Sequence, residues 1–325
     1  MASPFDGFEV EKALRPSARA VSFDLDRSLA SLVILHARVP ADAFTAPSLG
    51  RERLGNGIVI GKNGLVLTIG YLITEADDVT LLTNEGRRLP AHALGYDPVS
   101  GLGLVQALEP LDLPALPLGD SRHLKEEDPV ILAGGGGVAH ATVGQVIARQ
   151  PFTGYWEYLL DEALFTAPGH PHWSGAALIG PSGALMGVGS LQMNRVTPNG
   201  QSSLINMCVP IELLPPILDD LSRGRQVHAP RPWLGVYSQD SDAGVVVLDV
   251  ATDSPADRAE VRRGDVVLAV AGRPVPSLAE FYTRLWSLGP AGVVAPLRLR
   301  RDGDVFDVEV RTIDRASKLK KRRLN

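Results

Sequence analysis

The sequence predicts a mainly β protein with more than one domain, and three observations support this fold class. From about residue 30 to 210, short apolar runs are each bounded by Gly, Pro, Asn or Asp, as in antiparallel β-sandwiches and barrels. A basic linker that contains proline follows at 225–232. A second set of apolar runs then occupies residues 233–312, together with a turn-helix signal and one stretch of helical spacing.

Length and composition agree with this organisation. The chain has 325 residues and 45% hydrophobic content, which is enough for two or three buried cores. The formal charge of -5, with both signs mixed along the chain, provides no basic field, so we expect no nucleic-acid partner. The single cysteine, Cys208, cannot form an internal disulfide and lies in the apolar run "LINMCVPI". We expect it to be a small buried hydrophobic residue.

The first set of apolar runs is expected to form the strands of one domain, residues 31–224. The helical spacing of "IELLPPILDDLSRG" (211–224) predicts one helix that closes this domain and stops at Gly224. The expected strands are "SLVILHARV" (31–39), "GNGIVIG" (55–61), "GLVLTIG" (64–70), "DVTLLT" (78–83), "PVILAGG" (129–135), "ATVGQVIAR" (141–149) and "GALMGVGSL" (183–191).

The second domain is expected at residues 233–312 and mixes strands with two helices. A turn and helix are predicted at "DSPADRAEV" (253–261), and an amphipathic helix at "SLAEFYTRLWSL" (277–288). Its strands are expected at "WLGVYS" (233–238), "GVVVLDV" (244–250), "DVVLAVAG" (265–272), "VAPLRLRR" (294–301) and "VFDVEVRT" (305–312). Residues 313–325 form a basic tail, and its segment "RASKLKKRRLN" (315–325) is expected to be solvated and disordered.

The N-terminal extension, residues 1–30, has no basic segment followed by an apolar stretch of signal-peptide length. No segment approaches the length that spans a membrane. The sequence as written therefore predicts a cytoplasmic protein without a transmembrane segment, or a periplasmic one if a leader has been removed.

Ordered motifs over residues 30–312 resemble the HtrA family, in which a trypsin-like protease domain of two β-barrels precedes a PDZ domain. The resemblance implies a trypsin-like double barrel at 31–224 and, at 233–312, a PDZ domain that is a partly open β-barrel with two helices. The motifs are "GNGIVIGKNGLVLTIGYLI" (55–73), "ALGYDPVSGLGLVQ" (93–106), "LPLGDS" (116–121), "APGHPHWSGAALIGPSGALMGV" (167–188) and "MCVPIELL" (207–214).

The resemblance places the three catalytic positions of a serine protease on Ser174, Tyr71 and Gly101. Ser174 retains the nucleophile, whereas Tyr71 stands at the histidine position and Gly101 at the aspartate position. A serine hydroxyl is a poor nucleophile unless an adjacent base takes its proton. Tyrosine has an ordinary pKa of about 10 and is a weak base. We expect Tyr71 to be able to hydrogen-bond to Ser174 without activating it.

The loop before Ser174 departs from the family as well. His172 stands where the resemblance places the oxyanion-hole glycine, Pro171 precedes it, and the large Trp173 follows. We therefore expect a different loop conformation. His170 and His172 leave open a private Ser–His dyad or a metal site. No Asp, Glu or Cys cluster accompanies them in the sequence and turn histidines are often exposed, so the prediction is no metal and no cofactor.

The second domain keeps the family pattern better. "WLGV" (233–236) resembles the PDZ loop whose N–H groups receive a peptide's terminal carboxylate, and a strand follows it. Glu260 replaces the glycine of the usual Ala-Gly pair. The expected partners are C-terminal or extended peptide segments. The expected peptide-binding residues are Trp233, Leu234, Gly235, Val236, Tyr237 and Tyr282.

Three functions follow from these motifs. The favoured one is an HtrA-like pseudoprotease that acts as a peptide-binding scaffold or regulator in protein quality control. The alternatives are an active serine endopeptidase with a non-standard site around Ser174, and a chaperone-like binder of unfolded chains. The resemblance also implies a homo-trimer assembled through N-terminal segments. Phe5, Phe8 and Phe23 are candidates for that contact, or alternatively pack against their own barrel.

Overall fold

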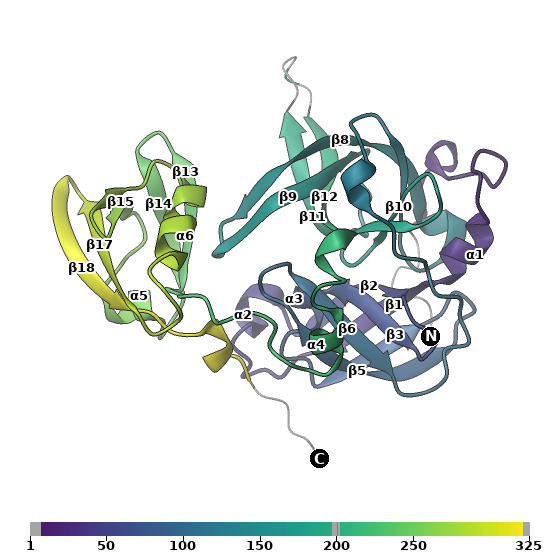
Figure 1. Ribbon diagram of the computed structural model, residues 1–325, viewed down its shortest axis with the longest axis horizontal. Helices are drawn as coiled ribbons and strands as arrows, with labels where there is room; N and C mark the ends of the chain where they lie inside the picture. The colour runs from purple at the N-terminus through teal and green to yellow at the C-terminus, as the bar shows by residue number, and fades with distance from the viewer. Residues whose placement is uncertain (1–7, 197–199, 201, 321–325) are drawn as a thin grey trace. The chain divides into compact units, whose positions relative to one another are not determined.

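The computed structural model describes residues 8–196, 200 and 202–320 and divides them into two compact units (Figure 1). The first unit comprises the described residues of the ranges 8–150 and 162–227. The second unit combines residues 151–161 with residues 228–320. No helix among the described residues is long and apolar enough to cross a membrane.

The first unit contains two closed β-barrels. The strand order of the first barrel is β1-β2-β3-β6-β5-β4. Its apolar runs are buried because the inward-facing side chains of a small barrel fill the interior; Leu67, Leu81 and Leu102 are completely buried. The strands of this barrel are β1 (Leu32–Arg38), β2 (Glu52–Val59), β3 (Leu65–Ile69), β4 (Asp78–Leu82), β5 (Arg88–Tyr96) and β6 (Leu102–Ala107).

The second barrel has the strand order β10-β11-β12-β9-β8-β7. Cys208 is fully buried in its core, as the apolar run predicted, and burial raises the pKa of its thiol to about 12. Two strands, β8 and β9, continue into the second unit as a hairpin. The strands of this barrel are β7 (Pro129–Ala133), β8 (Ala141–Gly154), β9 (Tyr158–Ala167), β10 (Ala177–Ile179), β11 (Leu185–Val196) and β12 (Ser202–Pro210).

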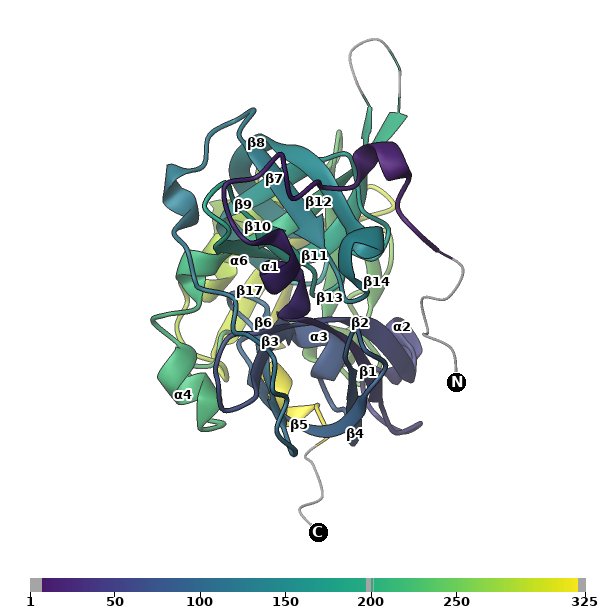
Figure 2. The same cartoon turned by 90° about the vertical axis from the view of Figure 1, so that its right-hand side faces the viewer.

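Short helices connect the strands of the first unit. The side chain of Asp24 accepts a hydrogen bond from Arg27 N–H and caps α1, which lies where the two barrels meet (Figures 1 and 2). The helices are η1 (Lys12–Leu14), α1 (Leu25–Ala30), α2 (Ala46–Leu49), α3 (Gly70–Ile73), η2 (Ser121–His123), η3 (Gly137–His140), η4 (Ile211–Leu213) and α4 (Leu218–Ser222).

The single helix predicted over 211–224 is wrong, because the segment forms the two short helices η4 and α4. Pro215 and Pro216 lie between them, and proline has no N–H to donate to a helix. Gly224 follows α4 with a φ of 66°, which is the conformation expected for a glycine after a helix.

The second unit contains a sheet with the order β13-β14-β15-β17-β18, with β16 paired to β15. The side chains of Ser254 and Ser277 cap its two helices, and α6 buries Phe281 and Tyr282 in the core. The mainly β class, with double barrel and α+β second domain, is thereby confirmed. The elements are β13 (Val236–Ser241), β14 (Gly244–Val250), α5 (Pro255–Arg258), β15 (Val266–Val270), β16 (Arg273–Pro274), α6 (Leu278–Trp286), β17 (Val294–Arg301) and β18 (Asp304–Arg311).

The C-terminal segment is ordered further than the sequence predicted. Ile313 pairs with Trp233 through backbone hydrogen bonds, and the short helix η5 (Arg315–Ser317) follows, capped by the side chain of Asp314. The expectation of disorder is therefore wrong for residues 315–320, because η5 and its side-chain cap order the start of this segment. The remaining tail, residues 321–325, lies outside the described residues.

Two of the three N-terminal phenylalanines contact the second barrel of their own chain. The rings of Phe8 and His172 lie 4.7 Å apart between centroids. A methyl group added at Gly183 would meet the ring of Phe23, so this side chain lies directly against the turn before β11. Both residues thus have the packing role that the sequence left open. Phe5 lies outside the described residues.

Candidate functional site

The first unit brings Tyr71 and Ser174 together from its two barrels. Tyr71 lies on α3, directly after β3, and Ser174 lies in the turn before β10. The Tyr71 hydroxyl is 2.7 Å from Ser174 Oγ and 2.8 Å from the backbone carbonyl of Ser190. A tyrosine thus lies directly against the serine of the protease motif.

The direction of these two hydrogen bonds follows from proton counting. A phenol carries one proton, and a carbonyl oxygen can only accept. The pair of contacts is satisfied when Tyr71 donates to the Ser190 carbonyl and the Ser174 hydroxyl donates to the Tyr71 oxygen. In that arrangement the oxygen next to Ser174 already carries a proton.

The protonation state of Tyr71 is stable around neutral pH. Burial raises the pKa of Tyr71 to about 12, although hydrogen bonds with Ser174 and Trp173 act in the opposite direction. At pH 7 the phenolate therefore amounts to roughly one molecule in 10⁵. Such a group is a poor acceptor for a second proton.

A buried polar network fixes the helix that carries Tyr71. The guanidinium of Arg53 donates to the backbone carbonyls of Tyr71 and Thr74 at 2.7 and 2.8 Å. Its other amino group donates to the hydroxyl of Thr45, at 2.7 Å. The carboxylate of Glu75 accepts the N–H of Thr45 at 2.7 Å. Arg53 and Glu75 are both buried, so this network holds α3 in place.

Gly101, at the predicted aspartate position, has no side chain and contributes only backbone groups to the site. Gly101 has a φ of 80°, and its carbonyl accepts the N–H of Gly70 at 2.7 Å. In the same turn the carboxylate of Asp97 accepts the N–H of Ser100 at 2.7 Å. The side chain of Asp97 thus serves the turn that contains Gly101.

The loop before Ser174 uses its N–H groups internally. The N–H of His172, at the oxyanion-glycine position, donates to Nδ1 of His170 at 3.0 Å. Nε2 of His170 lies 3.1 Å from the carbonyl of His140, so this nitrogen carries the proton. The N–H of His170 donates to the side chain of Asn206 at 2.6 Å. A donor that an oxyanion hole would need is therefore directed at an imidazole.

The histidines of this loop differ from the exposed turn histidines that the sequence suggested. His170 is fully buried, and burial lowers its pKa to about 4. Burial also lowers the pKa of His172 to about 4. Both ring nitrogens of His170 are engaged away from Ser174. Within the described residues no group of three His, Cys, Asp or Glu is placed to hold a metal ion.

Asn56 of β2 is a site residue that the sequence did not reveal. Its backbone N–H donates to the carbonyl of Ser174 at 2.8 Å, and its amide nitrogen lies 2.9 Å from the carbonyl of His172. Its amide oxygen accepts the N–H of Gly135 at 3.0 Å. Asn56 thus joins the nucleophile loop to the first barrel. A polar residue between two glycines in an apolar strand was the available indication.

The predicted carboxylate loop receives a carboxylate from within the second unit. Oε1 of Glu157 accepts the N–H groups of Gly235 at 2.7 Å, Val236 at 3.1 Å and Leu234 at 3.2 Å. Burial raises the pKa of Glu157 to about 7, while these hydrogen bonds and the charge of Arg315 act to lower it. The sequence did not single out Glu157, because its contact depends on residues 77 to 79 positions away.

The other predicted peptide-site residues lie around this contact. The Tyr282 hydroxyl is 3.1 Å from the carbonyl of Gly154 and accepts the N–H of Glu157 at 3.1 Å. The ring of Tyr237 lies 6.0 Å from that of Tyr155. Trp233 is buried and pairs with Ile313 through its backbone.

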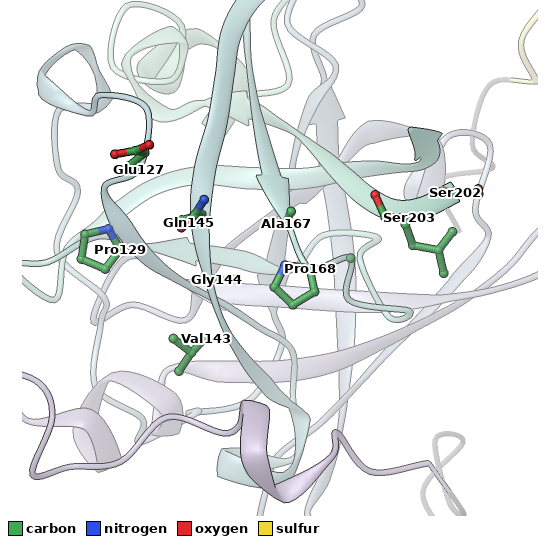
Figure 3. Close-up of a pocket in the computed structure, with 11 residues that line it drawn as sticks. Glu127, Pro129, Val143, Gly144, Gln145, Ala167, Pro168, Ser202 and Ser203 are labelled. Atoms are coloured by element: carbon green, nitrogen blue, oxygen red, sulfur yellow. The ribbon is translucent and has the colours of Figure 1, made fainter. Parts of the chain in front are cut away.

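A separate surface hollow lies on the second barrel (Figure 3). Pro129 and Val143 line one part of it, and Ala167 and Pro168 line another. It contains none of the residues of the Tyr71–Ser174 pair and none of the carboxylate loop.

The comparisons with known proteins agree with both units. Residues 55–188 match the family model of the trypsin-like peptidase domain, and residues 232–312 match that of the PDZ domain. The fold and the motifs thus define a trypsin-like peptidase domain followed by a PDZ domain. In sequence and fold the chain is HtrA-like.

Similar proteins include two curated relatives named "Probable periplasmic serine endoprotease DegP-like". The one from Chlamydia pneumoniae is 29% identical over 281 residues, which cover 81% of this chain and 55% of the relative. The one from Pseudomonas fulva is 28% identical over 275 residues, with 78% and 55% covered. The chain spans about half the length of these relatives.

Solved structures with the same fold include a serine endoprotease from Yersinia pestis, with a TM-score of 0.52 and 25% identity. That match covers 90% of this chain and 99% of the other. The HtrA-type protease AlgW with a decapeptide has a TM-score of 0.53 and 21% identity, with 92% and 98% covered.

Proposed function

We propose that this chain is a catalytically silent HtrA-like protein that acts as a scaffold or regulator by binding peptide segments through its PDZ domain. The contact between Tyr71 and Ser174 carries this proposal. Ser174 needs a neighbour that takes its proton during attack, and its neighbour is a protonated phenol with a raised pKa. In triad enzymes, loss of the base costs several powers of ten in rate.

The loop geometry supports the same proposal independently of the base. An oxyanion hole stabilises the negative charge that develops on the attacked carbonyl, and each donor is worth about 3 kcal/mol. In this chain the N–H of His172 is directed at His170. Both halves of acyl-transfer catalysis, activation of the nucleophile and stabilisation of the oxyanion, therefore lack a usual component.

The test of catalytic inactivity combines a covalent probe with a protease assay. We expect a fluorophosphonate probe to leave Ser174 unlabelled, and we expect unfolded casein to remain intact with both the wild type and Ser174→Ala. The DegQ endoprotease of Escherichia coli, 26% identical to this chain, serves as the positive control. Labelling of Ser174, or cleavage that disappears in Ser174→Ala, would support the alternative of an active endopeptidase with a non-standard site.

Peptide binding is proposed at β13 and the loop before it. β13 is at the end of the sheet order, so one of its sides can pair with an extended peptide. We expect C-terminal peptides to bind with an affinity on the order of micromolar, and amidated peptides to bind more weakly. Gly235→Val would weaken binding, but Gly235 has a φ of 85° and an added Cβ would collide with Ser254. That variant therefore distorts the loop itself.

The remaining functional alternatives have their own readouts. Suppression of the aggregation of an unfolded protein by full-length chain, without peptide selectivity, would favour the chaperone-like alternative. Sedimentation tests the trimer that the HtrA resemblance implies.

Cell fractionation tests the compartment, since the relatives named periplasmic favour the periplasm over the cytoplasm that the sequence alone suggested.

A further inference from the structure

We propose that the peptide site of the PDZ domain is occupied in cis by the tip of the β8–β9 hairpin, residues 151–161. The carboxylate of Glu157 takes the place of a peptide's terminal carboxylate, and an external peptide binds by displacing it. This inference rests on the peptide-binding part of the proposed function. It adds that the site is closed by a segment of the same chain.

The carboxylate contact has the chemistry of terminal-carboxylate capture. Three successive backbone N–H groups, those of Leu234, Gly235 and Val236, converge on the carboxylate of Glu157. Oε2 accepts a second contact from Leu234 N–H, at 3.1 Å. The terminal carboxylate of an external peptide would need the same three donors. The two ligands therefore exclude each other.

The backbone of the hairpin also pairs with the edge strand. The N–H of Ser238 on β13 donates to the carbonyl of Tyr155 at 2.9 Å. This is the kind of main-chain contact through which an extended peptide adds to a sheet edge. The segment thus provides both a carboxylate and a strand-like contact, two residues apart.

Tyr282 of α6 holds the other side of the hairpin tip. Its hydroxyl donates to the carbonyl of Gly154 at 3.1 Å and accepts the N–H of Glu157 at the same distance. These contacts fix the backbone on both sides of Tyr155 and Trp156. Glu157 itself has a φ of 59°, which is uncommon for a residue with a side chain. The surrounding contacts hold it there.

The compact unit agrees with these individual contacts. Residues 151–161 group with residues 228–320 in one unit, although β8 and β9 begin and end in the other. An external peptide therefore meets a site whose free fraction is set by release of the hairpin. The apparent dissociation constant of the peptide is its intrinsic dissociation constant divided by that free fraction.

Hydrogen exchange on the full-length chain tests the contact without any peptide. We expect the backbone amides of 234–236 to exchange about tenfold or more faster in Glu157→Ala than in the wild type. Asp161→Ala is the matched control, because Asp161 is an exposed acidic residue on the same hairpin. Equal exchange in all three proteins would overturn the proposal.

Peptide binding supplies the second measurement. The probe is a pool of labelled decapeptides randomised except for a C-terminal valine, used as free acids and as amides. We expect Glu157→Ala to bind the free acids about tenfold or more tightly than the wild type and Asp161→Ala. Glu157→Gln, which keeps the size of the side chain but removes its charge, should show a gain in the same direction.

The outcomes of the two measurements separate the inference from the proposed function. Faster exchange in Glu157→Ala with no peptide binding by any variant would support occupation in cis and reject capture of external peptides. Equal peptide affinity in the wild type and Glu157→Ala would overturn occupation in cis and leave peptide capture supported.

Discussion

The hydroxyls of Tyr71 and Ser174 lie 2.7 Å apart, and the tyrosine, held above its ordinary pKa by burial, stays protonated at neutral pH. Since the Ser190 carbonyl also needs the tyrosine proton, the pair behaves as a short chain of hydrogen bonds. These contacts link the two barrels, because Tyr71 follows β3 of the first barrel and Ser174 and Ser190 belong to the second.

Replacing Tyr71 by Phe tests that structural role. The substitution keeps the ring and leaves the Ser190 carbonyl and the Ser174 hydroxyl without the phenol, so we expect a loss of about 1–2 kcal/mol in unfolding free energy. Urea unfolding measures it. Tyr155→Phe is the control, because the Tyr155 side chain is 54% exposed and should change stability by less than about 0.5 kcal/mol. Equal effects would contradict the role of Tyr71.

Restoring the triad residues should fail to restore hydrolysis. We expect Tyr71→His with Gly101→Asp to remain at background in a casein assay, because the His172 N–H still points to His170. Gly101 also has a φ of 80°, so an aspartate there is strained. The single variant Tyr71→His is the matched control. Cleavage by the double variant above the level of this control would show that the loop can form an oxyanion hole.

His170 should make stability depend on pH. Its pKa is lowered from an ordinary value near 6.5 to about 4 by burial, so below pH 6.5 the unfolded chain binds a proton that the folded chain does not. The contribution of His170 to the free energy of unfolding is fully present above pH 6.5. It is lost as the pH decreases towards 4, and the loss is up to about 3 kcal/mol. Unfolding in urea across this range should give a flatter profile for His170→Gln than for the wild type. His123→Gln, at an exposed site, should retain the wild-type slope.

The buried network of Arg53 should contribute more to the free energy of unfolding than a surface ion pair does. Arg53→Ala removes the donor to Tyr71 and Thr74 and leaves the buried carboxylate of Glu75 without its nearby positive charge. We expect a loss of about 3 kcal/mol in unfolding free energy. Arg38→Ala breaks an exposed pair with Glu52 on the neighbouring strands and should cost less than about 1 kcal/mol. Similar losses of unfolding free energy for both variants would show that the buried network stabilises the fold no more than an exposed ion pair does.

Glu260→Gly should stabilise the PDZ domain. Glu260 has a φ of 57°, in the left-handed region that glycine enters at little cost, and the family resemblance places a glycine there. We expect a gain of up to about 1 kcal/mol in a thermal or urea unfolding experiment, and no gain for Glu260→Ala. A gain of the same size for the alanine variant would point to loss of the charge as the cause.

Much of the fold was predictable because it depends on local patterns. Alternating apolar runs indicated most strands, and the turn-helix signal at 253–261 and the amphipathic spacing at 277–288 indicated the helices that the structure has as α5 and α6. The helix over 211–224 was predicted wrongly because apolar spacing was given more weight than the Pro215–Pro216 pair. The prediction also missed strands, namely β5, β6, β9, β10, β12 and β16. Strands β10 and β16 are too short to show periodicity, whereas β5, β6, β9 and β12 were long enough and were not recognised in the apolar pattern.

The candidate site was predictable only in part. Motif order brought Tyr71 and Ser174 into one hypothesis, although 103 positions separate them. The roles of Asn56, Arg53 and Glu157 depend on backbone groups that come close only after folding, and backbone groups leave no mark in a sequence. The burial of His170 was missed for the same reason, since its partners belong to residues 140, 172 and 206.

The complete burial of Cys208, the one cysteine in the chain, has a practical consequence for spectroscopy. A thiol with a pKa near 12 and no exposed surface reacts poorly with maleimides, so the native chain gives almost no labelling background. A single cysteine introduced at the exposed position of Asp161 could then carry a fluorophore without further changes to the sequence. Its emission would follow the hairpin in real time while a ligand is titrated.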